Sequence, residues 1–108
     1  MVNVIHQKSL FGRRLREARL HVGIPQDKLG VMIGLDESCS SARMSRYESG
    51  IHSPPFNTVE RIADALKLPT AYFYCLDDSL AELTKLYFHA STENQNELLN
   101  YARKLNAV

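Results

Sequence analysis

Two arginines three positions apart, Arg43 and Arg46, stand among small polar residues in the run SSARMSRYESG at residues 40–50. A guanidinium is a planar fork of N–H donors that can pair with a phosphate or with the O6 and N7 atoms of guanine. If the run is helical, Met44 and Tyr47 share the inward face. The side chains that point away from that face are Ser41, Ala42, Arg43, Ser45 and Arg46. The run therefore predicts a short helix with a small, basic outer face.

No constellation of side chains in the sequence indicates catalysis, a metal site or a cofactor. There is no GxGxxG, P-loop, HExxH or GxSxG motif, and no pair of carboxylates is marked out by its context. Cys39 and Cys75 form no CxxC pair and have no histidine nearby at metal-ligand spacing. The four histidines are scattered along the chain: His6, His21, His52 and His89. We therefore expect no enzyme activity, no cofactor, no bound metal and two reduced thiols.

The chain has 108 residues, 44% hydrophobic and 23% charged, which suits one compact domain with little room for a second independent core. No stretch approaches the roughly 20 apolar residues that span a bilayer, and the N-terminus does not have the order of a secretion signal, so we expect a cytoplasmic protein. The net charge of +1 is uneven, with +3 in residues 1–61 and −2 in residues 62–108. The first part can therefore face a polyanion and the last part a protein partner.

Apolar residues recur at spacings of three and four along most of the chain, and no segment shows the alternation of a strand. The predicted helices run from Leu10 to a stop at Gly23, from Pro25 to a stop at Gly34, from near Ser41 to Gly50, from about Asn57 to Leu66, from Thr70 through Tyr74, from Asp78 through Tyr87, and from Thr92 through Leu105. The fold class is therefore expected to be all-α.

Polar residues at the helix starts predict several N-caps. Ser9 is expected to cap the first helix and Thr70 the short fifth one, and Thr92 with Gln95 resembles a capping box. The predicted apolar face of the second helix consists of Leu29, Met32 and Ile33.

Two short helices joined by a turn, followed by a helix with an open basic face, form the arrangement that lets a helix enter the major groove of DNA. The runs PQDKLGVMIG, SSARMSRYESG and PPFNTVERIADALKLPTAYF resemble the Cro and phage-repressor (XRE-type) helix-turn-helix family of transcriptional regulators. The likeness covers residues 9–76. It implies a five-helix lambda-repressor-like DNA-binding domain in residues 1–76, with double-stranded DNA as its partner. Two additional C-terminal helices are expected in residues 77–108.

The resemblance assigns DNA contacts to particular positions of this chain. The positions that match base-reading residues are Ser41, Ala42 and Arg46. Among them, Arg46 can pair with guanine, and Ala42 can contact a thymine methyl. The positions matched or suited to phosphate contacts, which set register without reading sequence, are Gln26, Ser40, Arg43, Ser45 and His52.

The resemblance also assigns structural roles. Arg19 and Glu48 match a salt bridge between the first helix and the end of the recognition helix, which would hold that helix at a fixed angle. Gly30 stands where the family usually has Ala, which implies that two helices cross closely there.

The turn before the recognition helix departs from the family pattern. Thirteen residues separate Gly34 from Glu48, about four more than in the compact pattern, and the run LDESC lengthens the turn. Asp36 and Glu37 within it either cap the incoming helix, which we favour, or repel DNA and lower its affinity. The residue at which the recognition helix starts depends on this turn.

The last two predicted helices carry an apolar stripe made of Leu80, Leu83, Leu86, Tyr87, Leu98, Leu99, Ala102 and Leu105. We expect the stripe to pair with a second copy, because one recognition helix reads only a few base pairs. A dimeric repressor would bind a pseudo-palindromic operator with half-sites about 34 Å apart. Three alternatives stay open: the helices fold back on their own core, they bind another protein as in an antitoxin-type autoregulator, or Cys39 makes the regulator redox-responsive.

Overall fold

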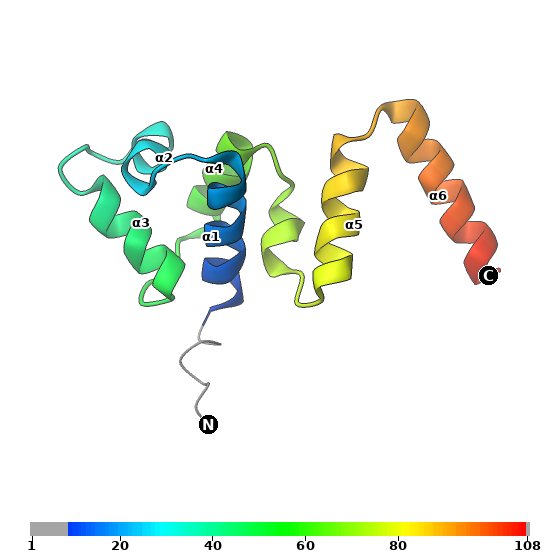
Figure 1. Ribbon diagram of the computed structural model, residues 1–108, viewed down its shortest axis with the longest axis horizontal. Coiled ribbons are helices and arrows are strands. Elements are labelled where there is room, and N and C mark those ends of the chain that lie inside the picture. The colour runs from blue at the N-terminus through cyan, green and yellow to red at the C-terminus, as the bar shows by residue number, and fades with distance from the viewer. Residues whose placement is uncertain (1–8, 108) are drawn as a thin grey trace, which may run out of the picture.

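The chain folds into helices throughout residues 9–107, the part that the computed structural model describes, and no strand occurs in that range. The order is α1 (Leu10–Val22), α2 (Gln26–Met32), α3 (Ser40–Ser49), α4 (Phe56–Leu66), the 3-10 helix η2 (Thr70–Tyr74), α5 (Asp78–His89) and α6 (Thr92–Asn106) (Figure 1). The prediction of an all-α fold is confirmed. None of these helices combines the length and the apolar character needed to cross a membrane.

The ends of α1 follow from the residues that flank it. The Ser9 hydroxyl accepts a hydrogen bond from the backbone N–H of Gly12 at 2.8 Å, as predicted for an N-cap. The helix ends at Gly23, whose φ of 83° is a left-handed conformation that glycine adopts without steric cost. Both signals lie within one turn of the helix end, which is why the sequence alone predicts them.

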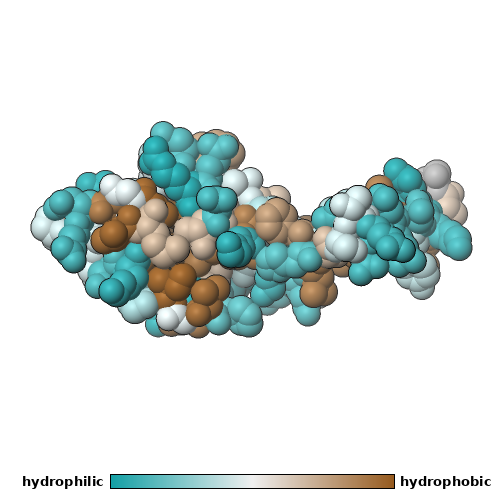
Figure 2. Space-filling model, turned by 90° about the horizontal axis from the view of Figure 1, so that it is seen from above, coloured by the Kyte–Doolittle hydropathy of each residue, from teal (hydrophilic) through white to brown (hydrophobic). Residues whose placement is uncertain are grey.

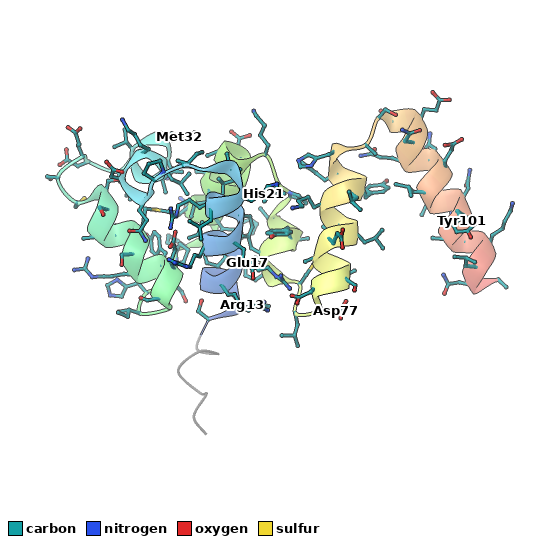
Figure 3. The ribbon with its side chains drawn as sticks, viewed as in Figure 1. Arg13, Glu17, His21, Met32, Asp77 and Tyr101 are labelled. Atoms are coloured by element: carbon teal, nitrogen blue, oxygen red, sulfur yellow. The ribbon has the colours of Figure 1, made fainter. Side chains whose placement is uncertain are left out.

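Two predictions at the ends of short segments are wrong. Thr70 does not cap the fifth segment, because Pro69 supplies the extended residue before the first helical one and Thr70 lies inside η2. Met32, predicted to face the core, is 56% exposed and lies on the outer side of α2 (Figure 3). Since α2 already ends at Met32, the chain turns there and Ile33 enters the core beside Leu29.

The predicted capping box of the last helix is also wrong. Ser91 caps α6, since its hydroxyl accepts a hydrogen bond from the backbone N–H of Asn94 at 3.1 Å, and Thr92 is the first helical residue. The side-chain N–H of Gln95 donates to the Tyr87 carbonyl oxygen at 2.9 Å instead of reaching back to the cap. Serine and threonine are similar N-caps, so the local sequence does not decide between adjacent ones.

One hydrophobic core joins the first five helical segments. Each segment contributes a fully buried side chain: Leu15, Leu29, Met44, Ile62 and Phe73. Phe73 packs against Phe11 and Tyr72, with ring centroids 5.3 and 5.2 Å apart. This core fixes α3 relative to its neighbours.

The last two helices make far less contact with this core. Ala81 is the buried residue of α5, and α6 has none in the part of the chain that the structure describes. Helix α6 stands beyond α5 at one end of the molecule (Figure 1), which narrows before this end when seen from above (Figure 2). Within a single chain, α6 therefore does not fold back on the core.

The predicted apolar stripe lies along an open groove of about 580 Å³ between α5 and α6. Seven of its eight residues line the groove: Leu80, Leu83, Tyr87, Leu98, Leu99, Ala102 and Leu105. The leucines among them are between 40% and 68% exposed, and Leu86, the eighth residue, lies outside the groove. A contiguous apolar surface is thus uncovered in the single chain.

Arg14 of α1 ties the core to the start of α5. Its side chain is buried, and its Nε and Nη2 atoms donate to the Cys75 carbonyl oxygen at 3.0 and 2.8 Å. Nη2 also donates to the Leu76 carbonyl oxygen at 3.3 Å and to Asp78 Oδ1 at 2.9 Å. The guanidinium lies 5.9 Å from the centroid of the Tyr72 ring. No sequence motif pointed to Arg14.

Asp78→Asn is expected to lower the free energy of unfolding at neutral pH but not at acidic pH. Hydrogen bonds from Arg14 and then from Arg13 hold the pKa of Asp78 below its ordinary value. A carboxylate with a depressed folded-state pKa stabilises the fold above its unfolded-state pKa, and that contribution is lost as the pH falls through the folded-state value. In urea titrations at pH 7 the free energy of unfolding of the wild type should be slightly higher than that of the variant. This difference should fade below about pH 4. A difference that persists at pH 2 would assign the effect to something other than charge.

Candidate nucleic-acid interface

Helix α3 has one buried and one open face. Met44 and Tyr47 are 0% and 5% exposed and hold the helix in the core, and Gly50 ends it with a φ of 83°. The exposed residues of α3 are Ser41, Ala42, Arg43, Ser45, Arg46 and Ser49. Helix α3 lies at the end of the molecule opposite α6, so the last helices of the same chain do not cover it (Figure 1). The open face therefore combines two guanidinium groups with side chains too small to obstruct them.

Ser40 does not belong to this open face. It is 0% exposed, and its hydroxyl donates to the Asp27 carbonyl oxygen at 2.6 Å. A Cβ on Gly30 would overlap the Ser40 hydroxyl and lie 3.1 Å from Met44 Cγ, so the missing side chain at Gly30 lets α2 and α3 pack closely. The phosphate role predicted for Ser40 is therefore wrong. Its position, four residues before Met44 on the inward stripe, was the signal that could have shown this.

Glu48, near the end of α3, is the centre of a buried polar network. Its side chain is 4% exposed and accepts hydrogen bonds from Arg19 Nε at 2.5 Å and from Arg19 Nη2 at 3.1 Å. Arg19 Nη1 donates to the Ile24 carbonyl oxygen at 3.0 Å. Gln26 Nε2 donates to Glu48 Oε1 at 3.0 Å, and Arg16 Nη1 lies 3.8 Å from the same oxygen. The network joins α1, α2 and α3 and sets the angle at which α3 is presented.

The turn between α2 and α3 is closed by its own residues. The Asp36 carboxylate accepts hydrogen bonds from the backbone N–H of Ser38 at 3.2 Å and from the Ser38 hydroxyl. Half-buried Cys39 precedes α3 and makes no side-chain capping bond. Asp36 therefore stabilises the turn rather than capping α3, contrary to the interpretation favoured from the sequence. The hydrogen bonds from the side chain and backbone of Ser38 hold the pKa of Asp36 below its ordinary value.

His52 lies in the loop that follows α3. Its backbone N–H donates to the Arg46 carbonyl oxygen at 3.2 Å, and its side chain is exposed. The loop therefore continues the open surface at the C-terminal end of α3.

Gly12 also positions α3, although no sequence motif pointed to it. A Cβ at Gly12 would lie 2.7 Å from the Tyr47 carbonyl oxygen and 2.9 Å from the Glu48 carbonyl carbon. The backbones of α1 and α3 are thus in contact at this point. A glycine inside an amphipathic helix costs helix stability, and that cost was the available signal for a close approach.

Comparisons with known proteins agree with this geometry. A family model described as a helix-turn-helix domain matches residues 10–72. Among solved structures, the crystal structure of the transcriptional regulator BswR is similar to this chain, with 42% sequence identity and a TM-score of 0.85 over 89% of this chain and 95% of that chain. This likeness extends beyond residues 10–72 and includes part of the α5–α6 region. A comparison with curated protein sequences gives no match.

Proposed function

This chain belongs to the helix-turn-helix family and is a DNA-binding transcriptional regulator, and we propose that it is a repressor that binds a pseudo-palindromic operator as a homodimer. The observation that carries the proposal is the open face of α3. A helix enters the major groove only if its exposed side is unobstructed, and the exposed side chains of α3 are small or basic.

Three residues of the open face are proposed to read bases: Ser41, Ala42 and Arg46. Arg46 is expected to contribute most to sequence specificity, since its guanidinium can pair with both guanine acceptors at once. Ala42 can contact only a thymine methyl or leave room for a neighbour. The Arg19–Glu48 pair supports this assignment, because it fixes the end of α3 from which Arg46 projects.

Phosphate contacts are proposed for Gln26, Arg43, Ser45 and His52. Gln26 is the first residue of α2, and its hydrogen bond to Glu48 uses one of its two side-chain N–H groups. The second N–H group is available for a phosphate oxygen. This arrangement would couple the docking of the backbone to the network that holds α3.

Arg46→Ala and Arg43→Ala are expected to weaken DNA binding in different ways. Loss of Arg46 should reduce affinity for the operator about tenfold and relax the preference at one base pair in each half-site, because a bidentate base contact is lost. Loss of Arg43 should weaken binding to all sequences alike and lower the slope of log K against log salt concentration by about 1.

Selection of bound sites from a random DNA pool provides the operator for this measurement, and its product is expected to contain two inverted half-sites. The affinities of both variants are then measured on operator and on random DNA at several salt concentrations. Arg61→Ala, which removes an exposed arginine of α4, is the control for the loss of one positive charge outside α3. If both variants lose the same affinity on operator and random DNA, the division into base and phosphate contacts is wrong.

The α5–α6 groove is proposed to be the dimerisation surface, with residues 77–108 serving this role. Its residues are apolar and exposed in the single chain, and most of them come from the stripe predicted on both helices. Burial of such a surface against a second copy removes apolar area from water. The charge of residues 62–108 is close to balanced, at −2, so it opposes self-association only weakly.

Leu83→Glu is expected to convert the dimer into a monomer. Leu83 is 55% exposed within the chain, so the substitution leaves the core of one copy intact while placing a charge in the paired groove. Light scattering should then give a mass near 12.3 kDa instead of twice that value. Leu20→Glu on α1, where the side chain is 54% exposed, is the matched control and should remain dimeric. A dimeric Leu83→Glu variant would place the interface elsewhere, and a monomeric wild type that co-purifies with another protein would favour the antitoxin-type alternative.

A further inference from the structure

The α5–α6 hairpin is attached to the rest of the chain at the junction of residues 75–78 between η2 and α5, and also by a 2.6 Å contact between His89 Nε2 at the end of α5 and the Lys67 carbonyl oxygen. Downstream of it, Ala81 is the buried residue of α5, and α6 has none within residues 9–107. The hairpin therefore gains little orientation from packing on the core. Its angle therefore depends mainly on polar contacts, those at the junction at the start of α5 and that of His89 at the end of α5.

Arg14 supplies the constraint at the junction. It is 3% exposed, and its guanidinium binds two successive backbone carbonyls, those of Cys75 and Leu76, as well as the carboxylate of Asp78 at the first position of α5. The guanidinium fork is planar and rigid, so several simultaneous bonds fix the direction of the chain and not only its distance. The Asp78 side chain is 80% exposed, so water screens its ion pair with Arg14. The hydrogen bonds to the two carbonyls therefore contribute more to the constraint.

Helix α1 connects this junction to the recognition helix. Arg14 and Arg19 are both buried on α1 and lie about 7.5 Å apart along its axis, given a rise of 1.5 Å per residue. Arg19 holds Glu48 near the end of α3, and Arg14 holds the start of α5. Arg13 and Asp77 lie along the same edge of the molecule, near the starts of α1 and α5 (Figure 3), and Arg13 Nη1 lies 3.4 Å from Asp78 Oδ1. Helix α1 thus acts as a rigid spacer between the DNA-reading and the self-pairing parts of the chain.

We propose that Arg14 determines which spacing between operator half-sites the dimer accepts. The inference rests on the proposed function, because only a dimer formed through α5 and α6 transmits the angle of the junction to the second copy of α3. One added base pair moves a half-site by about 3.4 Å and rotates it by about 35° around the duplex axis. A rigid junction cannot follow this change, whereas a loosened one can.

The test uses operators with identical half-sites and spacers changed by one or two base pairs. The full-length wild type should lose about tenfold in affinity for each step away from its preferred spacing. Arg14→Lys keeps the positive charge but has no fork, so it should bind all spacers within about threefold while its affinity for an isolated half-site is unchanged. A single glycine inserted after Leu76 changes no residue of the first five helical segments. It should make the affinity equally insensitive to spacer length, even if Arg14→Lys folds poorly.

Val59→Ala is the control for lost stability, since Val59 is 1% exposed on α4 and lies away from the junction. It should lower the melting temperature but leave the dependence of affinity on spacer length as in the wild type. The proposal is overturned if Arg14→Lys and the glycine insertion both lose affinity as steeply as the wild type when the spacer length changes. It is also overturned if the dimeric wild type binds operators of every spacer length with equal affinity. A wild type that is monomeric in light scattering and needs only one half-site would overturn the proposed dimer as well. This result distinguishes failure of the proposed function from failure of the role proposed for Arg14.

Discussion

Arg19→Met is expected to lower the free energy of unfolding by about 3–5 kcal/mol, because it leaves the carboxylate of Glu48 buried without its main partner. The Glu48 side chain is 4% exposed and that of Arg19 is 8% exposed, so water cannot replace the two lost hydrogen bonds. Gln26 and Arg16 remain nearby, but one is neutral and the other is 3.8 Å away. For a chain of this size the melting temperature should fall by at least about 12 °C.

A double-mutant cycle separates the stranded charge from the general loss of packing. Arg19→Met combined with Glu48→Leu removes both charges, and the double variant should recover more than half of the lost stability because no unpaired charge stays buried. Arg16→Met is the matched control on the same helix: the Arg16 side chain is 61% exposed, and its loss should cost at most about 0.5 kcal/mol. Additive effects in the cycle, measured by urea unfolding, would show that Arg19 stabilises the chain through packing and not through Glu48.

Gly12→Ala is expected to destabilise the chain by about 3 kcal/mol, although alanine is the better helix former by about 1 kcal/mol. The new Cβ would lie 2.7 Å from the Tyr47 carbonyl oxygen and 2.9 Å from the Glu48 carbonyl carbon. Both atoms belong to the backbone of α3, so no side-chain rotation relieves the overlap. Helices α1 and α3 must move apart, which also stretches the Arg19–Glu48 pair.

The sign of the effect decides this prediction. Helix propensity alone would make Gly12→Ala stabilising, and close helix packing makes it destabilising. Urea unfolding measures the sign, and backbone amide chemical shifts of α3 report whether the recognition helix has moved. A stabilised variant with unchanged shifts in α3 would refute the close contact between the two helices.

The features that could be predicted from the sequence depend on neighbours within one or two turns. Ser9 caps α1, Gly23 and Gly50 end α1 and α3, and the inward stripe of α3 runs through Met44 and Tyr47. Failures occurred where two neighbouring residues have similar propensities, as with the cap of α6. They also occurred where a polar residue lies on an apolar stripe, as with Ser40, whose burial depends on the space left by Gly30 on another helix.

By itself, the sequence determined the order of the helices and the small, basic outer face of α3, because helical periodicity is set by residues three and four apart. The family resemblance had assigned Arg19 of the run FGRRLREARL to a salt bridge, but the tertiary structure alone decided that Arg14 is structural too: both are buried, whereas Arg16 stays exposed. The acceptors that make this burial possible come from Cys75 and Glu48, which lie 61 and 29 residues further along the chain. A guanidinium is buried only where hydrogen-bond acceptors offset the free energy of its desolvation. These acceptors lie far away in the sequence, so no local sequence pattern predicts where the fold places them.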